Sequence, residues 1–196
     1  MKYDVLIIGA GPGGIFSAYE LMKERSDLRV AVFEAGHSLE KRRCPIDGDK
    51  VKSCIRCKSC SIMSGFGGAG AFSDGKLSLS CEVGGDLPSL IGTDVAQETI
   101  DYADKIYLEF GASTRVEGIG NTEEVKDIRK RAIKAGLRLV DCPIRHLGTE
   151  KAQDLYLAIE KYLQSNGVEM LFGWECTDLI LEGEECKGVY ITNGKE

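Results

Sequence analysis

The chain carries the sequence GAGPGG at residues 9–14, which has the spacing G-x-G-x-x-G. In a dinucleotide-binding turn the first glycine permits a tight bend, and the second lets the pyrophosphate approach the backbone. The third allows the following helix to pack closely on the preceding strand. A helix that starts at this turn would also offer free N–H groups and a partial positive charge to the phosphates. The segment therefore predicts a dinucleotide site.

A carboxylate lies at the distance from this turn that a ribose-binding residue would have. Glu34 ends a second apolar segment, 20 residues after Gly14. A carboxylate in that place accepts hydrogen bonds from a ribose 2′-hydroxyl and repels a 2′-phosphate. The pattern therefore disfavours NADP and leaves FAD and NAD open.

Cysteines form a second group of residues that could do chemistry. Cys54, Cys57 and Cys60 have the spacing C-x-x-C-x-x-C, and Cys44 precedes a proline upstream. Three thiolates at this spacing with a remote fourth cysteine are typical of iron–sulfur sites, and a four-cysteine zinc site is the other metal fit. A redox-active dithiol that passes electrons to a flavin and a loop of unligated cysteines are the two alternatives.

The elements around the glycine turn are a strand at 5–8, a helix at about 13–25 and a strand at 29–34. The continuous apolar run at 5–8 predicts a strand buried on both faces. From residue 35 to 92 no periodicity is visible, which is typical of a segment that wraps a ligand. Thr93, Thr122 and Thr149 are predicted to cap three helices that end near Phe110, Gly136 and Gly167. Strands are predicted at 168–172, 174–181 and 187–192, the last two as a hairpin across Gly183.

Composition limits the class of protein. With 196 residues, 43% of them hydrophobic and 29% charged, the chain is long enough for one globular domain. A net charge of −6 argues against nucleic-acid binding, and no apolar run is long enough to span a bilayer. We expect a cytoplasmic protein, in which eight cysteines indicate metal binding, redox chemistry or burial and not a disulfide framework.

The segment SGFGGAGAFSDGKL at 64–77 resembles the GGAG-x-FSDGKL signature of a family of FAD-dependent dehydrogenases. The sequence IRHLGT at 144–149 is similar to the same family, and NGVE at 166–169 followed by a hairpin resembles flavoproteins with two dinucleotide-binding domains. The resemblance implies an α/β, Rossmann-like FAD/NAD(P)-binding domain with a β-meander. It also implies an FAD-dependent oxidoreductase that works by hydride or electron transfer.

Members of that family continue beyond the hairpin, so we interpret the chain as an N-terminal part whose domain is incomplete at the C-terminus. On this reading residues 1–196 form one FAD-binding domain with a cysteine- and glycine-rich insertion at 35–92. The expected partners are a small-molecule substrate or an electron donor or acceptor, with no nucleic acid and no membrane. A non-catalytic flavin or iron–sulfur electron carrier and an NAD-binding subunit are the alternative functions.

Candidate site residues follow from the turn and from the resemblance together. Glycine amides at 67–70 could hold pyrophosphate or flavin carbonyl oxygens, and the side chains at 73–76 could bond ribityl hydroxyls. We expect the cofactor to contact Gly9, Gly11, Pro12, Gly13, Gly14, Glu34, Ala35, Arg43, Gly67, Gly68, Gly70, Ser73 and Lys76. His146 is the one candidate proton donor, with a purely structural hydrogen-bonding role as its alternative.

Overall fold

The computed structural model of the chain describes residues 2–120 and 122–195. Its contacts divide the chain into two compact units. Unit 1 contains the residues up to Ser73 together with those from Ala152 onward, and unit 2 contains Asp74–Lys151. The single domain with an insertion at 35–92 stays a prediction, and each unit is described separately below.

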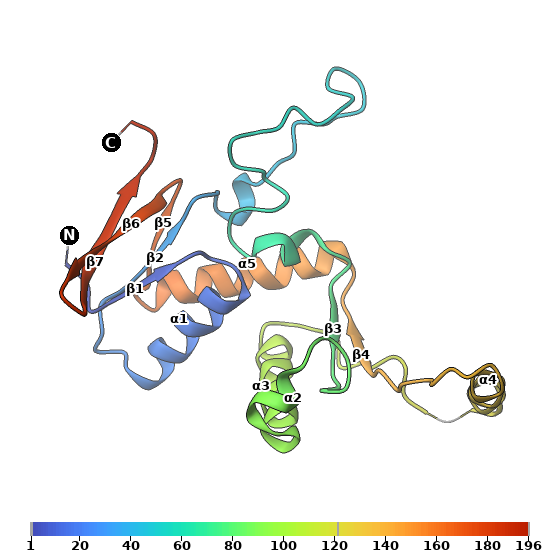
Figure 1. The fold of residues 1–196 in the computed structure, drawn as a ribbon. Helices are drawn as coiled ribbons and strands as arrows, with labels where there is room; N and C mark the ends of the chain where they lie inside the picture. Colours follow the sequence, from blue (N-terminus) through green and yellow to red (C-terminus); the bar gives the residue numbers. More distant parts are fainter. Residues whose placement is uncertain (1, 121, 196) are drawn as a thin grey trace. The chain divides into compact units, whose positions relative to one another are not determined.

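Unit 1 is built on a parallel sheet of three strands (Figure 1). Strands β1 (Val5–Ile8), β2 (Val30–Glu34) and β5 (Glu169–Phe172) lie in the order β1-β2-β5. Strand β2 is the central strand, and every one of its residues is buried. The strands that were predicted from apolar runs are confirmed, and Glu34 lies where the central strand ends.

Helices α1 (Pro12–Glu24) and α5 (Thr149–Ser165) lie beside this parallel sheet. They approach each other through the rings of Tyr19 and Tyr162, whose centroids are 5.8 Å apart. The buried side of α5 includes Leu155, Ile159 and Leu163, which the helical spacing predicted. The helix starts at Thr149 itself, so this residue is its first residue rather than a cap before it.

The hairpin of β6 (Glu175–Glu182) and β7 (Glu185–Thr192) faces β1 and β2 across a cavity of about 490 Å³. Leu6, Phe33 and Ile180 are among the residues that line this cavity. The prediction that β1 is buried on both faces is wrong, because Ile8 is 49% exposed. Strand β1 pairs with β2 alone among the described strands, and the hairpin leaves part of its outer face open.

Two short 3-10 helices, Leu39–Lys41 and Gly68–Phe72, interrupt the stretch of unit 1 that lacked periodicity. Unit 2 contains β3 (Lys76–Ser78) paired with β4 (Ile144–His146), and the helices α2 (Leu87–Ile91), α3 (Thr93–Glu109) and α4 (Glu123–Lys134). No described helix is both long and apolar enough to cross a membrane.

The three predicted helix caps have different outcomes in the structure. Thr122 does cap α4, since its Oγ1 accepts a hydrogen bond from the amide of Val125 at 3.3 Å. Thr93 does not cap α3, because Gly92 holds that position and Thr93 is the first helical residue. The apolar spacing of this segment predicts Val95 on the inner side of the helix, but Val95 is 51% exposed and Ala96 is buried instead.

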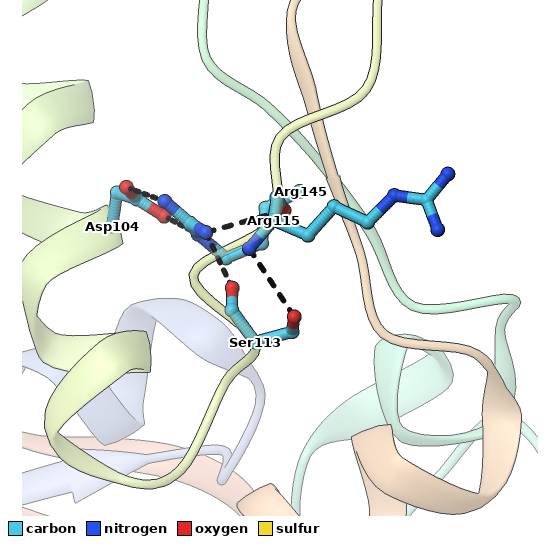
Figure 2. A network of polar contacts seen from close by, with 4 residues as sticks. All are labelled: Asp104, Ser113, Arg115 and Arg145. Carbon is cyan, nitrogen blue, oxygen red and sulfur yellow. Dashed lines mark hydrogen bonds and ion pairs between the residues drawn. The ribbon is translucent and has the colours of Figure 1, made fainter.

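A buried ion pair joins α3 to β4 in unit 2 (Figure 2). The guanidinium of Arg145 donates to both carboxylate oxygens of Asp104, and the Nη2–Oδ2 distance is 2.6 Å. Nη1 also donates to the backbone oxygens of Ser113 and Arg115. Burial of the guanidinium opposes its charge, but the hydrogen bonds to Asp104 outweigh this and raise the pKa of Arg145. The arginine of the IRHLGT segment therefore ties three parts of unit 2 together.

Replacing Arg145 by alanine is expected to destabilise the protein by about 3 kcal/mol, because the change leaves the Asp104 carboxylate largely buried without its partner. Chemical denaturation of the variant and of the wild type measures this loss. Arg115→Ala is the matched control, since the side chain of Arg115 is 80% exposed and its pairing with Glu117 is at the surface. Equal losses in the two variants would contradict a structural role for the buried pair.

Candidate functional site

The glycine turn at 9–14 joins β1 to α1 as its spacing predicted. The amide of Gly9 donates to the backbone oxygen of Phe33 at 2.7 Å, and its φ of 96° lies in the region that favours glycine. A Cβ on Gly14 would lie 2.0 Å from the backbone oxygen of Gly9. The first and last glycines are therefore required by the turn itself and by the approach of the helix to the strand.

The N-terminus of α1 is open to an anionic ligand. No side chain caps it, and no acidic residue lies in its first turn. Pro12 and Gly13 are exposed, and a Cβ on Gly11 or Gly13 would meet no atom within 4 Å. Unpaired N–H groups and the helix dipole together favour negative charge at such an end. The geometry fits the pyrophosphate of a dinucleotide.

Glu34 connects this turn to two other backbone segments. Its Oε2 accepts a hydrogen bond from the amide of Ala10 at 2.8 Å, and its Oε1 accepts from Gly36 at 2.7 Å and Gly65 at 2.9 Å. The residue is 8% exposed. A carboxylate offers about four acceptor positions, so one is left for a ribose hydroxyl. The structure thus gives Glu34 a role in assembling the site, while its contact with ribose stays a prediction.

The glycine segment at 65–68 lies directly against the turn. Gly67 donates its amide to the backbone oxygen of Ala10 at 2.8 Å, and a Cβ on Gly68 would come within 3.4 Å of Gly11 Cα. Sequence reasoning expected the amides of Gly67 and Gly68 to be free for the cofactor. That expectation is wrong, since Gly68 donates to the backbone oxygen of Gly65. These glycines allow backbone to pack on backbone, and their own contact with the cofactor stays a prediction.

Three other residues of unit 1 that were predicted to contact the cofactor are Ala35, Ser73 and Gly70. Ala35 is exposed immediately after β2. Ser73 is exposed and its Oγ donates to the backbone oxygen of Gly70 at 2.8 Å. A Cβ on Gly70 would lie 3.3 Å from the hydroxyl oxygen of Tyr156, so this glycine borders α5. Cofactor contact by these three residues stays a prediction.

Two adjacent arginines after β2 have opposite environments. Arg43, which the sequence favoured as a cofactor contact, is exposed, whereas Arg42 is 3% exposed and bonded to backbone oxygens of residues 61–68. Sequence reasoning did not separate them, because a loop carries no periodicity that tells which neighbour points inward. Both arginines follow the end of β2, from which the sequence predicted that either could reach adenosine or phosphate oxygens, and the structure shows that Arg42 is the buried one.

The four candidate metal ligands are all exposed, at Cys44, Cys54, Cys57 and Cys60. Within the described residues no three histidine, cysteine or acidic side chains gather closely enough to hold a metal ion. The amide of Arg56, which has a φ of 53°, donates to the sulfur of Cys54 at 3.4 Å. The spacing has produced a local turn here and not an assembled metal centre, and metal ligation stays a prediction.

Unit 2 holds the remaining candidates, Lys76 and His146, which face each other across the β3–β4 pair. Lys76 Nζ lies 2.8 Å from Asp74 Oδ2, and this contact lowers the pKa of Asp74 and raises the pKa of Lys76. His146 Nδ1 lies 3.7 Å from Glu117 Oε2. These side chains form an exposed charged group within unit 2, and a catalytic role for His146 stays a prediction.

Comparison with known proteins shows which fold the chain has, but it does not place the chain in a protein family. No protein-family model matches the chain. A protein of Clostridium beijerinckii (strain ATCC 51743 / NCIMB 8052), described as uncharacterized, is 37% identical over 77 residues, which are 39% of this chain and 14% of that protein. The chain thus spans a small part of this relative, and the dehydrogenase signature at 64–77 stays a resemblance.

Three solved structures share the architecture. The 3-ketosteroid-delta4-(5alpha)-dehydrogenase of Rhodococcus jostii RHA1 superimposes with a TM-score of 0.57 at 14% identity over 99% of this chain and 42% of its own. For an L-amino acid deaminase of Proteus vulgaris the TM-score is 0.52 at 14% identity, over 98% and 45% of the two chains. For the glycine oxidase of Bacillus cereus ATCC 14579 it is 0.50 at 16% identity, over 97% and 53%.

The chain therefore spans about half the length of these structures. At such identities the likeness concerns the fold alone, which is an α/β fold of Rossmann type with a parallel sheet. This confirms the predicted fold class. The hairpin β6–β7 supplies two strands in the place where a β-meander was expected.

Proposed function

We propose that this chain is the FAD-binding part of an FAD-dependent oxidoreductase. The observation that carries the proposal is the meeting of three segments where β1 and β2 end: the open N-terminus of α1, the carboxylate of Glu34, and the glycine segment at 65–68. Ligands of open α/β sheets bind outside the carboxyl ends of the strands. A dinucleotide with its pyrophosphate at α1 and its ribose near Glu34 fits this arrangement.

Each segment would have a separate task in holding the cofactor. The backbone at Gly11 and Gly13 would face the pyrophosphate, since no protein atom occupies the space beside these glycines. The remaining acceptor position of Glu34 would take a ribose hydroxyl and would repel a 2′-phosphate. Bound FAD would supply the hydride or electron transfer, while the protein binds and orients it.

One observation favours FAD over NAD as the dinucleotide. The glycine segment at 65–68 belongs to the stretch that resembles the FAD-family signature, and it packs on the phosphate turn through a 2.8 Å hydrogen bond from Gly67 to Ala10. The three structures that share the fold are described as a dehydrogenase, a deaminase and an oxidase, which agrees with an oxidoreductase.

Replacing Gly11 by alanine is expected to weaken FAD binding at least tenfold while the free energy of unfolding changes by less than about 0.5 kcal/mol. The added methyl group meets no protein atom within 4 Å, so the fold tolerates it. It would instead stand where the pyrophosphate approaches the backbone. Calorimetric titration with FAD measures the affinity, and denaturant unfolding measures the stability.

Ser17→Ala is the matched control, because Ser17 is exposed on the same helix and its Oγ donates within that helix to the backbone oxygen of Gly13. This variant should bind FAD as the wild type does. If Gly11→Ala binds FAD with unchanged affinity, the pyrophosphate does not lie at this turn and the proposed site is wrong.

A further inference from the structure

Arg42 is a buried cation whose hydrogen bonds all go to backbone oxygens. Nε donates to Ser61 at 2.8 Å and Nη2 donates to Ile62 at 2.8 Å. Nη1 donates to Phe66 at 2.6 Å and to Gly68 at 2.8 Å. Four of the five N–H groups of the guanidinium are thus used, and their acceptors lie within a single stretch of the chain.

The segment that Arg42 holds is the one that contacts the phosphate turn. Between the Phe66 and Gly68 carbonyls, Gly67 donates its amide to Ala10, and just before them Gly65 donates to Glu34. A guanidinium fork fixes several acceptors at once, which a flexible point charge cannot do. Arg42 therefore sets the position of a segment that forms one wall beside the turn.

The charge of Arg42 is only partly compensated. Among the described residues it forms no ion pair with a carboxylate. Its guanidinium carbon lies 4.6 Å from the centre of the Phe72 ring, a contact that stabilises a cation modestly. Burial lowers the pKa of Arg42, and the nearby Glu34 and Cys60 oppose this only in part. A buried positive charge in such surroundings is stabilised by any anion that binds close by.

We propose that Arg42 is a positioning residue of the dinucleotide site. It holds residues 65–68 against the phosphate turn through their backbone oxygens, and its buried charge is balanced by the pyrophosphate when the dinucleotide binds. The ligand class is an adenosine diphosphate group, as in ADP or FAD. This inference rests on the proposed function, because it assumes that a pyrophosphate lies at the N-terminus of α1.

The test compares Arg42→Lys, which keeps the charge and loses the fork, with Arg42→Gln, which loses both. Binding of ADP and of adenosine to the full chain is followed by NMR titration, which also measures weak affinities. Amide hydrogen exchange at Gly65 and Gly67 is measured without ligand. Lys41→Gln is the matched control, since Lys41 is the exposed neighbour and carries the same charge.

In both Arg42 variants the amide hydrogens of Gly65 and Gly67 should exchange with solvent at least tenfold faster than in the wild type. Arg42→Lys should lower the affinity for ADP and for adenosine by similar factors. Arg42→Gln should lower the affinity for ADP a further fivefold or more relative to adenosine, which a purely structural role would not do. The control should match the wild type in all measurements.

The inference is overturned if the two amides stay protected in Arg42→Lys, or if Arg42→Gln leaves the ratio of ADP to adenosine affinity unchanged. If Arg42→Gln does not fold, the exchange and affinities of Arg42→Lys decide the positioning role. A wild type that binds neither ADP nor FAD would refute the proposed function instead. The exchange measurement, which needs no ligand, would still report whether Arg42 positions the segment.

Discussion

Replacing Glu34 by alanine is expected to destabilise the protein by at least about 3 kcal/mol and to abolish measurable dinucleotide binding. The carboxylate accepts the amides of Ala10, Gly36 and Gly65 at distances of 2.7–2.9 Å in a buried place. Each amide that loses its partner costs about 1–3 kcal/mol. Ala10 belongs to the phosphate turn and Gly65 belongs to the glycine segment. Without the carboxylate of Glu34, these two segments would no longer be held together, and the binding site would be lost. Denaturant unfolding and FAD titration measure the two effects.

Two further variants show whether the hydrogen bonds are responsible. Glu34→Gln keeps one acceptor oxygen and places a donor where an acceptor is needed, so its loss of stability should lie between those of the wild type and Glu34→Ala. Glu40→Ala is the matched control, because Glu40 is exposed and its contact with Lys161 is at the surface. An alanine variant that unfolds like the wild type would contradict the assembling role of Glu34.

The second large effect is expected for Gly14→Ala, which should cost more than about 4 kcal/mol or prevent folding. The new Cβ would lie 2.0 Å from the backbone oxygen of Gly9 and 3.1 Å from Ile7 Cγ2. The backbone of Gly9 cannot move away without disturbing the junction of β1 with α1. Thermal and denaturant unfolding of the purified variant measure the cost.

The neighbouring glycine provides the matched control for stability. A Cβ on Gly13 would meet no atom within 4 Å. Alanine is also the better helix former by about 1 kcal/mol, so Gly13→Ala should be at least as stable as the wild type. Equal destabilisation of the two variants would mean that the close approach of α1 to β1 is not what requires glycine at residue 14.

The part of the site that could be predicted from the sequence is the part in which spacing has a direct geometric meaning. The turn at 9–14 and Glu34 follow from a pattern that fixes strand, turn and helix in order. The helices with regular apolar spacing were also located closely, as Leu155, Ile159 and Leu163 of α5 show. Local periodicity determined these elements, and tertiary contacts did not change them.

The rest depends on contacts between segments that are distant in sequence. That Arg42 and not Arg43 is buried follows from the path of residues 61–68, which no local pattern determines. The exposure of Ile8 follows from the place of β1 at the edge of the described sheet. The amides of Gly67 and Gly68 were expected to be free, but Gly67 donates to Ala10 in the phosphate turn and Gly68 donates to Gly65 within its own segment.

Titration of the purified chain with FAD, monitored by its visible absorption and fluorescence, tests the central claim most directly, with NADH as the competing ligand. We predict that one FAD binds per chain and perturbs the flavin spectrum, and that NADH does not displace it. Binding of NADH without binding of FAD would contradict the proposal that this Rossmann turn belongs to a flavin site.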